Sequence, residues 1–439
     1  MHTYLSILIT LASNSLPKPK DVRAPILTSH IISSFPNGMP PSSDFFEVRD
    51  IPNAGRGVIA RRSLPTATQI LSTSNLAAHV VFREYRKEVC AQCFHYDRGR
   101  TLAVRDVETG RVFCSRECCD EWVEDQGEIG VEAWRALETW VKARGGALWC
   151  TATAQTAGDR PGIEEISAAW VEVQDVRVTK ADESRAEAKE RRKMLQRITS
   201  GAIDPDILAY LLSGILFVSR YPALFLSDVL DLAMDPTPYR TASDLTSHTS
   251  SFLQLASLLP PSLVPQCTTS ATQTLISAAS HNSFGIRAGS EEDMEEYMGY
   301  ALYPLASYFN HSCGPNVAKQ RKGRKWEFWT SREVKEGEEL CISYVGGDEK
   351  GLDLKGRRER LERTWGFEFN LHPLLQPVIG TSHTTSAPSS TTTDMPYAYI
   401  NAVWIKMVWN EHGQLIVLTL PPYMCFEFPS AKDVHMSAT

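Results

Sequence analysis

The chain has 439 residues, 43% of them hydrophobic and 22% charged, which is the composition of a soluble globular protein with room for two or three domains. A formal charge of −7 and a pI near 5.9 argue against a bulk electrostatic hold on nucleic acid, so direct nucleic-acid binding is not expected. The most apolar run, Ile207–Val218, is too short to span a bilayer, and Leu5–Leu11 follows no basic residue. We therefore expect no membrane partner, no signal peptide, and an intracellular location in the nucleus, the cytoplasm or both.

The N-terminal part of the chain changes character near residue 44. Residues 1–43 mix Ser, Pro and scattered apolar residues without a period, which predicts a poorly ordered leader. From Phe45 to Leu71, short apolar pairs alternate with turn residues, which predicts two or three strands. Gly55-Arg56-Gly57 is expected between these strands, where glycines either let the backbone approach a ligand closely or supply the positive φ of a turn.

Five of the ten cysteines lie between Cys90 and Cys119, which favours a metal site over a disulfide framework. Cys90 and Cys93 form one close pair, and Cys114 and Cys118 form another after an intervening loop. Each pair can bring two thiolates onto one tetrahedral Zn²⁺ ion, and the second pair lies at a predicted helix start, where amide dipoles favour thiolates. The alternative is four buried free cysteines. We expect one zinc ion bound by these four residues.

Helical patterns dominate the middle of the chain. Glu128–Arg144 and Ala181–Ile198 are predicted helices, and opposite charges three and four residues apart on the second indicate a solvated face. Ile203–Ala233 and Ser250–Leu259 continue the helical pattern between prolines. Acidic and basic residues are interleaved, which disfavours a nucleic-acid-binding arm.

The densest polar cluster, NHSCGPN, occupies Asn310–Asn316 and follows an apolar run. Buried amides and imidazoles need partners, so this cluster indicates a site, although Gly-Pro-Asn is also ordinary turn chemistry. Asn282-Ser283-Phe284 precedes the cluster. Ile342-Ser343-Tyr344 follows it, at the end of a stretch that predicts strands joined by turns.

Together these motifs resemble those of SET-domain lysine methyltransferases. NHSCGPN resembles the family signature N-H-S-C-x-P-N, ISY at residues 342–344 resembles the second signature, and GRG at residues 55–57 resembles the first motif. NSF at residues 282–284 resembles a phrase found in members with a MYND insertion, and the cysteine pairs look like half of a MYND zinc finger. In the family, the two signatures pass close together in a knot-like arrangement that forms the methyl-donor pocket.

The resemblance implies roles for individual residues. Tyr344 would be the catalytic tyrosine, whose hydroxyl orients the substrate amine. S-adenosylmethionine would be the methyl donor, and a lysine of a protein or peptide, with a histone tail as one candidate, would be the acceptor. The implied cofactor-binding residues are Arg56, Gly57, Asn282, Asn310, His311 and Phe367, with Trp365 as a further aromatic beside Phe367.

Each role has a plainer structural alternative. Tyr344 could be a strand residue that packs inward, and His311 could be a buried histidine that donates to a backbone carbonyl. Asn282 could be a cap or turn residue. Phe367 and Trp365 could be ordinary core aromatics. Spacing alone does not separate these interpretations.

The region after Tyr344 departs from the family pattern. Family members usually carry a Cys-x-Cys-x2-Cys segment there, which binds zinc together with the cysteine of NHSC. Leu361–Asn370 keeps aromatic residues but has no cysteine, so Cys313 lacks partners of that spacing, and Cys425 alone cannot replace them. This loss favours an alternative function, a catalytically weak scaffold in which the fold and its zinc insertion mediate protein–protein interaction.

The expected fold class is α+β, a split SET β-fold with inserted zinc-finger and helical segments. The predicted parts are a disordered leader (1–43), the N-terminal part of the SET domain (44–80), a MYND-like zinc insertion (81–125), a helical insertion (126–280), the C-terminal part of the SET domain with the catalytic motifs (281–347), a post-SET remnant (348–372), and a low-complexity linker with an unassigned tail (373–439).

Overall fold

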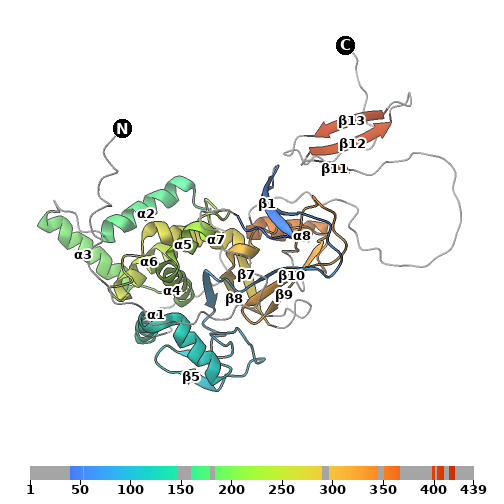
Figure 1. Cartoon of the computed structure of the whole chain (residues 1–439). Helices are drawn as coiled ribbons and strands as arrows, with labels where there is room; N and C mark the ends of the chain where they lie inside the picture. Colours follow the sequence, from blue (N-terminus) through green and yellow to red (C-terminus); the bar gives the residue numbers. More distant parts are fainter. Residues whose placement is uncertain are drawn as a thin grey trace, which may run out of the picture. The chain divides into compact units, whose positions relative to one another are not determined.

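The structure is a computed structural model in which helices and strands are mixed, confirming the predicted α+β class (Figure 1). The residues that it describes are 40–52, 54–145, 160–177, 183–288, 296–344, 351–365, 398–400, 403–409 and 415–420. Most of the predicted leader, the low-complexity linker and Phe367 lie outside these ranges.

All the named strand pairs are antiparallel, and the N-terminal strands pair with strands far along the chain. The orders are β1-β2, β3-β10-β9, β4-β8-β7, β5-β6 and β11-β12-β13. The bounds are β1 Phe46–Ile51, β2 Gly55–Ala60, β3 Gln69–Thr73, β4 Ala78–Val81, β5 Val104–Asp106, β6 Arg111–Phe113, β7 Ser283–Arg287, β8 Tyr297–Leu302, β9 Val317–Lys322, β10 Lys325–Thr330, β11 Ala398–Ile400, β12 Val403–Trp409 and β13 Leu415–Leu420.

The strand pairing shows that the β-fold is assembled from two separate parts of the chain. Thr73 of β3 faces Trp326 of β10, and Ala78 of β4 faces Leu302 of β8. β10 alternates buried Trp326 and Phe328 with less buried residues, as a strand with one covered face requires. Gly323, with a φ of 65°, supplies the left-handed backbone that the tight β9–β10 turn needs.

The helices of the chain lie mainly between the two halves of this β-fold in sequence (Figure 1). Their bounds are α1 Arg116–Arg144, α2 Ile163–Arg177, α3 Arg185–Ser200, α4 Pro205–Arg220, α5 Pro222–Leu224, the π-helical turn η2 Phe225–Val229, α6 Ala242–Leu258, α7 Thr269–Asn282, the 3₁₀ turn η3 Pro304–Ala306 and α8 Leu354–Trp365. α1 is interrupted at Gly127, whose φ of 64° and ψ of 173° are not helical.

α4 is the central helix of this group, because it packs against β4, α1, α6 and α7. Asp204 caps its start by accepting hydrogen bonds from the amides of Asp206 and Ile207, and Pro205 occupies the first turn, where no amide hydrogen is needed. Among the described residues, no single helix is long and apolar enough to cross a membrane, and α4 meets the criterion only together with Pro222–Val229, at a bend of 109°.

Candidate functional site

The two signature segments lie side by side. His311 and Ile342 form a parallel bridge, in which the Ile342 amide donates to the Asn310 carbonyl at 2.9 Å and the Ser312 amide donates to the Ile342 carbonyl at 2.9 Å. The backbone thus holds the polar cluster against the segment that ends in Tyr344. This is the proximity that the resemblance implied.

β2 lies on the other side of the same segment. The Leu340 amide donates to the Val58 carbonyl at 2.7 Å. Asn316, the last residue of NHSCGPN, accepts from the Cys341 amide at 2.8 Å and donates to the Glu339 carbonyl at 2.7 Å. Three stretches that are far apart in the sequence therefore meet at residues 339–344.

Gly55 and Gly57 of the first motif both lie at the start of β2 rather than between strands. The two glycines have different structural roles. Gly55 supplies the positive φ, at 69°. A Cβ on Gly57 would lie 2.3 Å from Ile51 Cδ1 and 2.7 Å from both Asn310 Nδ2 and Glu339 Oε1. Gly57 therefore permits close approach, in this structure by Asn310 and Glu339, which hydrogen-bond to each other at 2.9 Å.

His311 is held as a neutral imidazole. Burial, with a smaller contribution from Lys319, lowers the pKa of His311 to about 4. Nδ1 accepts a hydrogen bond from the Tyr344 amide at 2.9 Å, so the proton is on Nε2, which faces Cys313 Sγ at 3.2 Å. His311 thus accepts from the backbone, whereas the structural alternative had it donating to a carbonyl.

The Tyr344 side chain is held by a hydrogen bond from its hydroxyl and by contacts of its ring. Its hydroxyl donates to the Phe309 carbonyl at 3.0 Å, and its ring lies 5.4 Å from the His311 ring and 5.2 Å from the Trp365 ring. Burial, followed by the neighbouring Cys341 and Glu339, raises the pKa of Tyr344 well above its ordinary value. The hydroxyl is therefore a neutral group whose proton is committed to the backbone and whose lone pairs can still accept.

Asn282 ends α7, where its side-chain amide donates to the carbonyls of Ala233 and Ala278, each at 2.8 Å. This bonding matches the capping alternative for the NH₂ group. The carbonyl oxygen Oδ1 has no hydrogen-bond partner among the described residues. The neighbouring Ser283 Oγ is buried and likewise unpartnered within the described part of the chain.

Arg56 belongs to a cluster that the sequence did not reveal. It forms an ion pair with Asp231 at 2.5 Å, and its guanidinium lies 5.2 Å from the centre of the Tyr308 ring. The Tyr308 hydroxyl donates to the same Asp231 oxygen at 2.7 Å. Asp231 follows η2 in the helical part of the chain, so this part reaches both the first motif and the residues just before Asn310.

The four predicted metal ligands converge. The sulfur atoms of Cys90, Cys93, Cys114 and Cys118 all lie within 4.8 Å of one another. Cys93 and Cys114 are 3.6 Å apart, and Cys114 and Cys118 are 3.5 Å apart. Ser115 caps the start of α1 by accepting from the Cys118 amide, so the second pair does straddle a helix start, as predicted. This cluster can hold a metal ion.

Contact between the thiols and burial shift the pKa values of Cys90, Cys93 and Cys118 in different directions. A hydrogen bond with Cys93 lowers the pKa of Cys90 to about 5, and the same contact raises the pKa of Cys93. Burial raises the pKa of Cys118 to about 12. A divalent cation would reverse these penalties, because thiolates are the form that binds metal.

Sequence reasoning missed Glu339, Phe309 and Asp231. Glu339 and Phe309 each lie beside a predicted signature, so their proximity to those segments could have pointed to them. Nothing in the sequence pointed to Asp231, because its contact with Arg56 depends on how the inserted helices pack. Phe367, predicted at the same site, is outside the described residues, whereas its neighbour Trp365 contacts Tyr344.

Comparisons with known proteins agree with these motifs. The SET domain family matches residues 55–345. A potential protein lysine methyltransferase, SET6 of Saccharomyces cerevisiae, is 26% identical over 370 residues, covering 74% of this chain and 94% of the yeast protein. A SET and MYND domain-containing protein of Dictyostelium discoideum is 31% identical over 99 residues, 23% of each chain. Histone-lysine N-methyltransferase SET5 of Eremothecium gossypii is 38% identical over 66 residues, 15% of this chain and 13% of that protein.

Proposed function

This chain belongs to the SET-domain family, and from that membership we propose that it is an S-adenosylmethionine-dependent protein-lysine methyltransferase. The observation that carries the proposal is the meeting of the Gly55–Gly57 motif, the NHSCGPN signature and Tyr344 around one short segment. The yeast relative, aligned over 94% of its length, is named as a potential protein lysine methyltransferase.

The residues at the junction fit the methyl donor. When bound, S-adenosylmethionine supplies an electrophilic methyl group on a positively charged sulfur. We assign its binding to Arg56, Gly57, Asn310, His311 and Asn282. The Ser283 hydroxyl, next to Asn282, supports this assignment, since a buried polar atom without a partner among the described residues generally bonds to water or a ligand.

Tyr344 positions the acceptor amine. Because its hydroxyl proton points to the Phe309 carbonyl, its oxygen presents lone pairs that can accept a hydrogen bond from the incoming amine. Its raised pKa keeps the hydroxyl protonated at neutral pH, so no phenolate is available as a base and its contribution is orientation. Alignment of this kind can contribute on the order of 7–11 kcal/mol to a displacement reaction. Burial beside Trp365 and His311 favours the neutral form of the lysine, which is the nucleophile.

We further propose that the four-cysteine cluster binds one Zn²⁺ ion with a structural role. Four sulfur ligands at about 2.3 Å from a tetrahedral zinc are about 3.8 Å apart. The spacings of 3.5 and 3.6 Å within the cluster are close to that value. Four thiolates complete the coordination sphere, which is typical of structural rather than catalytic zinc.

The substrate class is a lysine within a basic protein segment. A net charge of −7 would attract such segments and offers little to nucleic acid. Histone tails are our first candidate, since the Eremothecium relative is named a histone-lysine N-methyltransferase.

Two measurements test the function. Isothermal titration with S-adenosylmethionine should give saturable binding to the purified full-length protein. Radiolabelled methyl transfer to a library of lysine peptides, including histone tails, should then give product that acid hydrolysis identifies as methyl-lysine. Binding without transfer to any peptide or protein extract would favour the scaffold alternative. No binding at high micromolar cofactor would overturn the proposal.

A further inference from the structure

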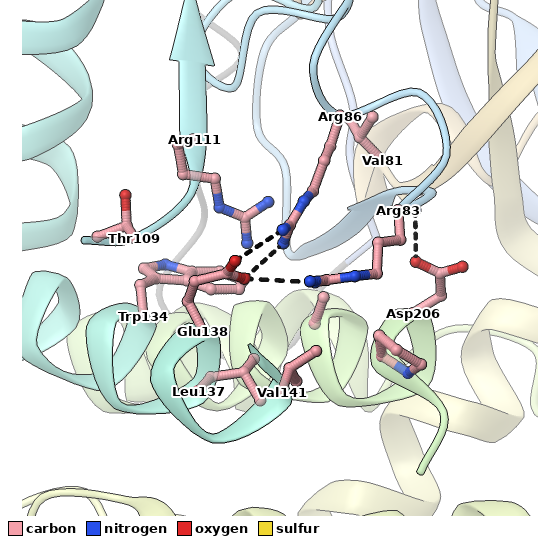
Figure 2. A pocket seen from close by; sticks show the side chains of 12 residues that line it. Val81, Arg83, Arg86, Thr109, Arg111, Trp134, Leu137, Glu138, Val141 and Asp206 are labelled. Carbon is pink, nitrogen blue, oxygen red and sulfur yellow. Dashed lines mark hydrogen bonds and ion pairs between the residues drawn. The ribbon is translucent and has the colours of Figure 1, made fainter. Parts of the chain in front are cut away.

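A second polar cluster lies away from the proposed methyltransferase site, where β6, α1, α4 and the loop after β4 meet (Figure 2). At its centre is Glu138 of α1, which is only 3% exposed. Arg86 donates two hydrogen bonds, of 2.7 and 2.8 Å, to this carboxylate, and Arg83 donates a third at 3.3 Å. Bidentate guanidinium–carboxylate bonding already occupies both Glu138 oxygens.

A third arginine, Arg111, lies beside this cluster but makes no hydrogen bond to the Glu138 carboxylate. Its guanidinium stacks on the Trp134 ring, 4.0 Å from the ring centre, and Figure 2 shows it beside Arg86 with no bond to Glu138. Its Nε is buried without a hydrogen-bond partner, and no other bond from its guanidinium to a described residue is present. A buried N–H group with no acceptor destabilises the folded state, and more so when the group is charged. Arg111 Nε therefore lacks an acceptor among the described residues, and a ligand from outside the protein could supply one.

The charge balance indicates that this acceptor is negative. Three guanidinium groups face two carboxylates, Glu138 and Asp206, which leaves one positive charge in excess. Lys142, 3.5 Å from Glu138, adds to that excess. Burial, then the proximity of Arg86, lowers the pKa of Arg111 to about 9. Water would satisfy the N–H groups but would not offset the charge.

The size of the cavity limits the ligand. The cavity has a volume of about 20 Å³, and its walls include Val81, Leu137 and Val141 as well as the arginines. About 10–15 Å³ is needed for one water molecule, so there is room for a single water or an ion of similar size and none for a phosphate or an organic acid.

We propose that this cavity binds one monatomic anion, chloride under ordinary conditions, held by Arg111 and the neighbouring arginines. The ion would complete the junction between the strand that leads to Cys114 and the helices α1 and α4. The proposal is independent of methyl transfer, since it rests on Arg111, the charge excess and the cavity volume.

The first test is the melting temperature of the full chain in chloride and in gluconate at equal ionic strength. Gluconate is too large for the cavity, so the wild type should melt several degrees higher in chloride. Arg111→Met keeps an unbranched side chain against Trp134 and should lose that difference. Arg105→Met, at an exposed position in the adjacent strand β5, should retain it and so removes general salt effects. Equal melting temperatures of the wild type in the two salts would overturn the proposal.

The second test locates the ion directly and does not depend on a variant that folds. Crystals of the wild type grown or soaked in bromide should give an anomalous peak within hydrogen-bond distance of the Arg111 guanidinium. A water molecule at that position with no anomalous signal would overturn the proposal.

Discussion

The Tyr344 hydroxyl donates a hydrogen bond to the backbone carbonyl of Phe309, the residue just before the NHSCGPN signature, at 3.0 Å. The two signature segments are thus joined by a side chain as well as by the bridge between His311 and Ile342. This bond fixes the direction of the hydroxyl proton, so the same oxygen can orient an amine.

Tyr344→Phe should lower kcat for methyl transfer on the order of 10²-fold, the usual cost of misplacing a reacting group by about 1 Å. Its affinity for S-adenosylmethionine should stay near that of the wild type. Tyr303→Phe is the matched control, because the Tyr303 hydroxyl also donates to a backbone carbonyl, that of Arg324, at 2.8 Å. Both variants should lose about 1 kcal/mol of stability, and only Tyr344→Phe should lose turnover. Equal kcat values would remove Tyr344 from its role.

Gly57→Ala should weaken both stability and cofactor binding. The new Cβ would displace Ile51, Asn310 and Glu339, and overpacking of this kind costs about 1–3 kcal/mol. Gly162→Ala serves as the control, because nothing lies within 4 Å of a Cβ at that position. Calorimetric titration and thermal unfolding of both variants measure the two effects. Unchanged cofactor affinity in Gly57→Ala would separate this glycine from the binding site.

Cys118→Ser should release the zinc ion, while Cys119→Ser should retain it. The two cysteines are adjacent, but only Cys118 belongs to the four-sulfur cluster. Elemental analysis should find about one equivalent of zinc in the wild type and in Cys119→Ser, and much less in Cys118→Ser. A wild-type protein that folds and remains equally stable in strong chelator would contradict the structural role.

The protein should lose stability in mild acid partly through His311. The pKa of His311 in the folded protein is about 4, below the value of about 6.5 for an unfolded chain. Between these values only the unfolded state binds the proton, so the free energy of unfolding falls as the pH drops from about 6.5 to about 4. The loss from this residue should reach up to about 3 kcal/mol and be absent above pH 6.5.

His311→Gln can still accept the Tyr344 amide hydrogen through its side-chain oxygen and does not titrate. Its unfolding free energy, measured in denaturant at several pH values, should fall less steeply with acid than that of the wild type. The half-buried His79, His248 and His281, whose pKa values are also lowered by partial burial, remain in both proteins. Parallel curves would assign the acid sensitivity to those residues instead.

Much of the site could be predicted from sequence because its parts are local. NHSCGPN and ISY are contiguous motifs whose backbone geometry brings His311 to Ile342, and two close cysteine pairs can meet with few alternatives. What could not be predicted depends on packing between distant side chains. Asp231 reaches Arg56 because the inserted helices fold back, and Arg111 Nε lacks an acceptor among the described residues because Arg86 and Arg83 occupy Glu138. No periodicity or spacing encodes such competition.

Asp231→Asn should weaken cofactor binding from within the helical part of the chain. Asp231 holds the Arg56 guanidinium and the Tyr308 hydroxyl at once, so the neutral amide would lose the ion pair and loosen both. The two charged side chains are each 29% exposed, and a pair of this kind contributes up to about 1 kcal/mol, or roughly fivefold in the dissociation constant for S-adenosylmethionine. Asp228→Asn is the control, since Asp228 bonds to Asn75 and Ser227 rather than to Arg56. High salt should narrow the gap between wild type and Asp231→Asn, because the pair is partly solvated. If both variants bind the cofactor as the wild type does, Arg56 needs no support from the inserted helices.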